Sequence, residues 1–140
     1  MRYMLDTCTF LYLANDHDLL DRNVTDILHD PSNVLCVSAE TGRELIVAFN
    51  NRKFTSKKWK TSNDMIRSIE SDFGIQILPI DKNVIDTYSK LELNELQDHR
   101  DPSDHIIISH AMTLKMPLIS SDTKFGFYAK QGLDLIINKK

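Results

Sequence analysis

Four acidic residues occupy positions from which their carboxylates could act together. Asp6 directly follows the apolar run YML, and Asp122 comes two residues after the run PLIS. Glu44 falls in the second turn of an expected helix after VLCV, and Asp104 falls in the first turn of a later one. In an open parallel sheet, ligands bind beyond the carboxyl ends of the strands. The four acids are therefore expected to meet at one edge of such a sheet.

Carboxylates gathered at one edge would repel one another unless a cation neutralised them. Two carboxylates about 5 Å apart, at an effective dielectric constant of about 20, repel by roughly 3 kcal/mol. Ligand sets made only of oxygen favour hard ions such as Mg²⁺ or Mn²⁺ over zinc. A hard ion lowers the pKa of water and stabilises charge on phosphoryl oxygens. The four acids therefore predict a Mg²⁺ or Mn²⁺ site for phosphodiester hydrolysis.

Some of the acids near these positions have a purely structural explanation. Asp101 is suited to cap the helix that opens with Pro102, and Asp104 could then be a favourable first-turn acid. Glu40 complements the dipole of a helix capped by Ser38. This explanation does not apply to Glu44, which lies too far into its helix.

Short apolar runs alternate with segments of helical period, a pattern that predicts an α/β fold with a mainly parallel sheet of five strands. With 140 residues and no linker rich in Pro or Gly, we expect a single domain over residues 1–140. The predicted strands are Arg2–Leu5, Val34–Val37, Gly74–Pro79, Pro117–Ser120 and Leu133–Ile137. The predicted helices are Thr9–Ala14, Val24–His29, Ala39–Asn50, Thr61–Phe73, Lys82–Leu91 and Pro102–Lys115.

Several functional classes find no support in the residues. Neither a signal peptide nor a membrane span fits the start MRYMLDTCTFLYLA, so we expect a cytoplasmic protein without membrane contact. Cys8 and Cys36 lack the spacing of a zinc site, and His99, His105 and His110 add no ligand pattern. The sequence contains no P-loop, no GxGxxG and no GxSxG. Nucleotide-cofactor and serine-nucleophile chemistry are therefore not indicated.

Positive charge is concentrated in the segment RKFTSKKWK, which carries five basic residues and no acid. The chain as a whole has a formal net charge of −3, which argues against indiscriminate coating of nucleic acid. The segment is either a solvated loop and helix start or an arm that binds phosphates. In the second interpretation, Trp59 would stack on a base and the phosphates would contact Lys57, Lys58 and Lys60.

Four stretches of the chain resemble the PIN-domain family, in particular the VapC-like toxins of bacterial type II toxin–antitoxin pairs. They are MLDTCTFLYLA, VSAETGRELIVA, HRDPSDHIIISHAM and PLISSDTKFGFY, and they span nearly the whole chain. The HxDPxD block, followed by a helix, a short strand and (S/T)xD, is the most specific part. The resemblance implies a three-layer α/β/α sandwich and a Mg²⁺- or Mn²⁺-dependent endoribonuclease. It also implies a homodimer that a cognate antitoxin silences by covering the active site with its tail.

Carried over residue by residue, the resemblance implies particular roles at the site. Asp6, Asp104 and Asp122 would hold the metal, and Glu44 would act on the attacking water or as a further ligand. Ser38 and Asp101 would support them. The chain departs from the family pattern at three positions, where Ser103 replaces a common aromatic residue, His105 a common arginine and Arg43 a frequent tryptophan.

Three alternatives to the nuclease interpretation differ in the residues they require. A haloacid-dehalogenase-like phosphatase needs a second aspartate two residues after Asp6, where this chain has Cys8. A receiver-like domain needs an acidic pair near the first strand, an aspartate after the third strand and a late lysine, and no such set occurs in this order. A catalytically weak PIN-like module that binds RNA or protein would keep the same acids.

At His105, a histidine could add a pH-dependent contact with phosphate.

Overall fold

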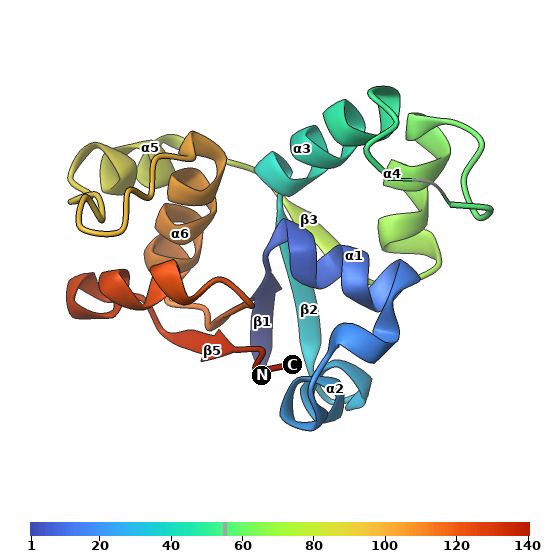
Figure 1. Cartoon of the computed structure of the whole chain (residues 1–140), viewed down its shortest axis with the longest axis horizontal. Coiled ribbons are helices and arrows are strands. Elements are labelled where there is room, and N and C mark those ends of the chain that lie inside the picture. Colours follow the sequence, from blue (N-terminus) through green and yellow to red (C-terminus); the bar gives the residue numbers. More distant parts are fainter. Residues whose placement is uncertain (55) are drawn as a thin grey trace.

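The computed structural model describes residues 1–54 and 56–140 and places a sheet between two layers of helices (Figure 1). All strand pairings are parallel, and the strand order is β3-β2-β1-β4-β5. The three-layer α/β/α sandwich with a five-stranded sheet is thus confirmed. The strands are β1 (Arg2–Leu5), β2 (Val34–Ser38), β3 (Gln76–Leu78), β4 (Leu118–Ser120) and β5 (Leu135–Ile137).

Alternate side chains of each strand enter two separate hydrophobic cores. In β1, Leu5 packs with α1, α2 and α4 on one face, whereas Met4 packs with α6 on the other. Val37 and Cys36 of β2 divide in the same way. Figure 1 shows α1, α2 and α4 on one side of the sheet and α5 and α6 on the opposite side. Because both faces are covered, the strands are short continuous apolar runs.

The helices largely follow the periodicity of the sequence. The structure contains α1 (Thr7–Asn15), α2 (Arg22–His29), α3 (Ala39–Asn50), α4 (Ser62–Ser71), α5 (Lys82–Ser89) and α6 (Pro102–Leu114). Helix α1 begins two residues earlier than expected, because Asp6 itself is the N-cap and accepts a hydrogen bond from the backbone of Thr9 at 2.9 Å. Asp6 therefore directly follows β1, caps α1 and is a candidate site residue.

Two 3-10 helices were not predicted from the sequence. They are η1 (His17–Leu19) and η2 (Thr123–Gln131). In η2, Phe125 and Tyr128 are buried three residues apart, so both lie on the same face of the 3-10 helix. Among the helices of the described residues, none is long and apolar enough to cross a membrane.

Candidate active site

An acidic pocket of about 340 Å³ opens at the carboxyl ends of β1 and β4. These strands are neighbours, with Leu5 paired to Ile119. Strand β2, which follows β1 in the sequence, lies on the other side of β1, so the strand order changes direction between β1 and β4. A parallel sheet binds ligands at such a switch point. The pocket is lined by the four predicted acids together with six further residues: Asp6, Glu44, Asp104, Asp122, Asp101, Thr7, Cys8, Tyr12, Ser121 and Phe125.

Asp6 is held at the floor of the acidic pocket and is only 6% exposed. Burial raises the pKa of its carboxyl, and hydrogen bonds from Ser120 and Thr9 offset part of this effect. The Ser120 hydroxyl also accepts a hydrogen bond from the backbone of Asp122 at 3.0 Å. A single serine at the end of β4 thus links the two acids, and this explains the (S/T)xD spacing in structural terms.

Asp104 lies in the first turn of α6, where Asp101 caps the helix by accepting a hydrogen bond from the backbone of Ser103 at 3.0 Å. Burial, reinforced by the charges of Asp101, Asp6 and Asp122, raises the pKa of Asp104 to about 7. Its Oδ2 atom lies 3.0 Å from Nε2 of His99. Burial lowers the pKa of His99.

His99 belongs to the site, although it was not among the predicted site residues. Nitrogen and oxygen atoms of His99, Asp104 and Asp122 all lie within 4.8 Å of one another. The histidine was set aside because its spacing matched no zinc pattern, yet it is the first residue of the HxDPxD block. Asp6 and Glu44 line the same pocket outside this tightest group, and their metal-binding roles remain predictions.

Glu44 points from α3 toward α1, where its Oε1 accepts a hydrogen bond of 2.6 Å from the hydroxyl of Thr7. Burial raises the pKa of Glu44, and the Thr7 bond opposes the shift. Cys8 lies in the first turn of α1 and lines the acidic pocket. Desolvation and nearby carboxylates raise the pKa of its thiol to about 11, which disfavours a thiolate nucleophile.

The two predicted supporting residues occupy different places. Asp101 lines the acidic pocket and caps α6. Ser38 is fully buried behind the pocket, where it caps α3 through a 3.1 Å bond from the backbone of Glu40 and lies 2.8 Å from Nδ1 of His110. Ser38 therefore acts on the start of α3, the helix that carries Glu44.

Two of the three departures from the family pattern contact each other at the rim of the pocket. Arg43 donates to Glu40 from Nε at 2.9 Å and to the Ser103 hydroxyl from Nη2 at 2.8 Å, and Ser103 also bonds to Glu40. The Arg43 side chain remains 59% exposed. The third departure, His105, is 2% exposed and its Nε2 lies 2.9 Å from the backbone oxygen of His99. A contact between His105 and phosphate is therefore contradicted.

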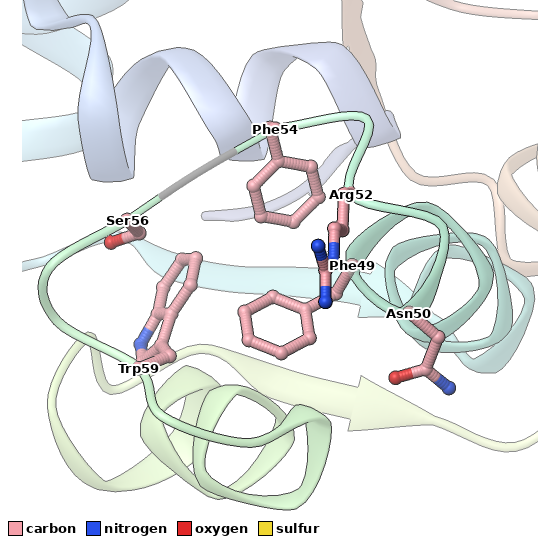
Figure 2. A pocket seen from close by; sticks show the side chains of 6 residues that line it. All are labelled: Phe49, Asn50, Arg52, Phe54, Ser56 and Trp59. Carbon is pink, nitrogen blue, oxygen red and sulfur yellow. The ribbon is translucent and has the colours of Figure 1, made fainter.

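The basic segment lies elsewhere, next to a second pocket of about 410 Å³ (Figure 2). Its Thr55 lies outside the described residues. Trp59 is only 5% exposed and packs edge-on against Phe54, with ring centroids 6.2 Å apart, so the expectation that it stacks on a base is wrong. Lys58 donates to the backbone oxygen of Ala14. Lys57 and Lys60 are exposed, and the described residues of the segment, 52–54 and 56–60, do not line the acidic pocket.

Fold and site together define a class: parallel α/β sandwiches with a cluster of carboxylates at the switch point of the sheet. Within this class, the sequence profile described as PIN domain matches residues 3–131. The chain therefore belongs to the PIN-domain family. Comparison with curated protein sequences gives no match.

Solved structures with similar folds come from bacterial VapBC complexes. A chain of VapBC2 from Rickettsia felis, bound to a promoter DNA fragment, has a TM-score of 0.73 and 24% identity, with 98% of each chain covered. For VapBC-1 from nontypeable Haemophilus influenzae these values are 0.69 and 24%, with both chains fully covered. VapBC-5 from Mycobacterium tuberculosis, of the VapBC family of toxin-antitoxin systems, gives 0.60 and 18% over 99% of this chain and 98% of the other. At these identities, the similarity supports the fold.

Proposed function

We propose that this chain is a Mg²⁺- or Mn²⁺-dependent endoribonuclease, acting as one PIN domain over residues 1–140, and the toxin of a toxin–antitoxin pair. The observation that carries the proposal is the convergence of Asp6, Glu44, Asp104 and Asp122 on one pocket at the switch point of a PIN-domain sheet. The donors are carboxylate oxygens with one neighbouring imidazole, a set that fits Mn²⁺ as well as Mg²⁺. RNA as the substrate rests on the family resemblance.

The residues of the pocket would divide the work as follows. Asp6, Asp104 and Asp122 hold the ion, which when bound lowers the pKa of water and stabilises charge on phosphoryl oxygens. Glu44 accepts a proton from the attacking water or supplies a further ligand. Its pKa is raised by burial, which brings the carboxylate closer to the range of an effective general base.

The first test compares the purified chain with its Asp6→Ala variant on mixed cellular RNA. Each protein is incubated with Mg²⁺, with Mn²⁺ or with chelator, and single-stranded DNA serves as the competing substrate. We expect RNA cleavage that requires both the ion and Asp6, because the variant also controls for contaminating nucleases. Intact RNA in all lanes, together with no heat of metal binding, would favour the weak binding module instead.

We further propose that Arg43 contacts the RNA backbone at the rim of the pocket. Hydrogen bonds to Glu40 hold its guanidinium and raise the pKa of Arg43, and the charges of Glu40, Glu44 and Asp101 add to this shift. A fixed, exposed guanidinium beside an acidic pocket is suited to a phosphate that enters the pocket. Lys57, Lys58 and Lys60 remain a second proposed contact, reached only by RNA that extends beyond the pocket.

Salt dependence distinguishes these two contacts. For Arg43→Gln, we expect weaker RNA binding, a salt slope smaller by about one and slower cleavage at saturating RNA, because the lost contact borders the reacting phosphate. For the matched double variant Lys57→Gln/Lys60→Gln, we expect a smaller slope with unchanged cleavage at saturation. Binding titrations at four salt concentrations, with single-turnover rates, measure both. An unchanged slope for Arg43→Gln would remove it from the interface.

Two partners are proposed on the resemblance and the neighbours' descriptions. The first is a cognate antitoxin, by analogy with the toxin-antitoxin systems to which VapBC-5 belongs. The second is another copy of this chain.

A further inference from the structure

A buried chain of hydrogen bonds runs from the backbone of Asn94 to Asp104. The N–H of Asn94 donates to the hydroxyl of Tyr128 at 3.1 Å, and this hydroxyl lies 2.9 Å from Nδ1 of His99. Nε2 of His99 lies 3.0 Å from Oδ2 of Asp104. Asn94, Tyr128 and His99 are 1%, 0% and 4% exposed. These three residues are thus shielded from solvent, and the series of hydrogen bonds ends at Asp104, which lines the acidic pocket.

The direction of this chain follows from its first donor. A backbone N–H can only donate, so the Tyr128 oxygen accepts from Asn94 and its own hydrogen is available for Nδ1 of His99. With Nδ1 as acceptor, a neutral imidazole carries its hydrogen on Nε2, which then donates to Asp104. In this direction every hydrogen along the chain meets an acceptor, as buried polar groups require.

We propose that His99 is a positioning residue, which Tyr128 holds in the Nε2–H form and which fixes the carboxylate of Asp104 for metal binding. The inference rests on the proposed role of Asp104 as a metal ligand. It adds that the orientation of this carboxylate is set by two residues that do not line the acidic pocket. His99 occupies the Oδ2 side of Asp104, which leaves Oδ1 for the ion.

The surroundings of His99 favour a fixed ring. Its centroid lies 4.8 Å from that of His105 and 5.4 Å from that of Phe125, and Nε2 of His105 lies 2.9 Å from its backbone oxygen. A first-turn aspartate beside other acids would otherwise turn toward solvent to reduce repulsion. A hydrogen bond from a clamped imidazole opposes that rotation, as outer partners of metal ligands generally do.

The competing role for His99 is that of a direct nitrogen ligand, since its ring lies within 4.8 Å of ligand atoms of Asp104 and Asp122. Metal binding through Nε2 requires a lone pair there and therefore a hydrogen on Nδ1. That form would leave the Tyr128 hydroxyl hydrogen without His99 as its acceptor. The two roles thus differ in the tautomer of His99 and in their dependence on the Tyr128 hydroxyl.

The experiment measures Mn²⁺ affinity by calorimetry for the wild type, Tyr128→Phe and His99→Phe, with Tyr3→Phe as the control. Both phenylalanine variants keep a ring in the core, and melting temperatures report whether they fold. Tyr3 carries an exposed hydroxyl outside the pocket. Its variant therefore also removes a tyrosine hydroxyl but leaves the hydrogen bonds between Asn94 and Asp104 intact. In the metal-free wild type, long-range ¹H–¹⁵N spectra of the imidazoles report the tautomer.

We expect His99→Phe to bind Mn²⁺ 10- to 100-fold more weakly, as is typical when the outer partner of a ligand is lost. Tyr128→Phe should weaken binding by about 10-fold, Tyr3→Phe should match the wild type, and His99 should be in the Nε2–H form. Wild-type affinity in a folded Tyr128→Phe, or an Nδ1–H form of His99, would overturn the proposal. Because the tautomer is read without metal or RNA, failure of the nuclease assignment would be seen separately, as absence of cleavage by the wild type.

Discussion

Replacing Asp104 by asparagine is expected to lower RNA cleavage by about 10²- to 10³-fold while the protein stays folded. The change is nearly isosteric and removes one negative charge from the ligand set, and a metal ion supplies several kcal/mol of transition-state stabilisation. Asparagine can still accept the hydrogen bond from His99. Single-turnover rates at saturating Mn²⁺ measure the effect, and circular dichroism reports the fold.

The control for this prediction is Asp86→Asn, which neutralises an exposed acid of α5 paired with Lys90. It should cleave at the wild-type rate, because it lies outside the acidic pocket. If well-folded Asp104→Asn cleaves as fast as Asp86→Asn, Asp104 is a first-turn acid of α6 and nothing more.

The strands and the acids at their ends could be predicted because they depend on local patterns. Residues Arg2–Leu5 and Leu118–Ser120 are apolar runs that end at a polar residue, and parallel strands bring such ends to one edge. Asp6 and Asp122 follow these strands, so their meeting in one pocket required no knowledge of distant contacts. Glu44 could be included in the predicted site because it lies too far into its helix to act as a capping residue.

The parts that could not be predicted depend on contacts between distant segments. Trp59 stands among lysines, and its burial depends on the hydrophobic core that it joins, which includes Leu5, Phe10 and Ile119 from distant parts of the chain. His99 has no ligand spacing in the sequence, and its place is fixed by Tyr128, 29 residues away. In the 3-10 helix η2, the buried residues Phe125 and Tyr128 lie three positions apart. A pattern of two residues does not distinguish a helix from a loop unless the core that the helix covers is known.

The network of Arg43, Glu40 and Ser103 shows how departures from a family pattern can be related. Taken singly, a serine in place of an aromatic residue and an arginine in place of a tryptophan cast doubt on partner and substrate contacts. In the structure the two side chains bond to each other and to Glu40. At this rim the chain therefore has a polar contact at the two positions where the family pattern has aromatic residues.

Without metal, the Asp104→Asn variant is expected to be more stable than the wild type at pH 8, with the difference vanishing toward pH 4. The pKa of Asp104 is raised from 3.8 in a model compound to about 7 in the folded protein. As the pH rises from 4 to 7, the unfolded state therefore loses a proton that the folded state retains, and the wild type loses stability. Three pKa units correspond to about 4 kcal/mol as an upper limit, or roughly 14 °C in melting temperature.

The comparison of variants isolates this carboxyl from the other groups that titrate in the same range. Burial lowers the pKa of His99, His105 and His110, which makes the wild type gain stability with pH up to about 6.5 and partly hides the effect of Asp104. Subtracting the melting curves of Asp104→Asn and wild type in chelator removes the shared contribution of His105 and His110, while the contact between His99 and Asp104 counts as part of the Asp104 effect. Asp86→Asn should show no such difference at any pH.

Adding Mn²⁺ should abolish the stability advantage of the variant at pH 8. An ion that binds only the folded state stabilises it by about 4.1 kcal/mol at 1,000 times its dissociation constant, which matches the upper limit of that advantage, and the wild type retains the full ligand set. The variant lacks one charged ligand and should gain much less. Equal melting temperatures of the two proteins in chelator from pH 5 to 8 would show that the acidic pocket carries no electrostatic strain at Asp104. A metal would then not be needed to relieve repulsion there, and the argument that the acids are assembled for a cation would lose its physical basis.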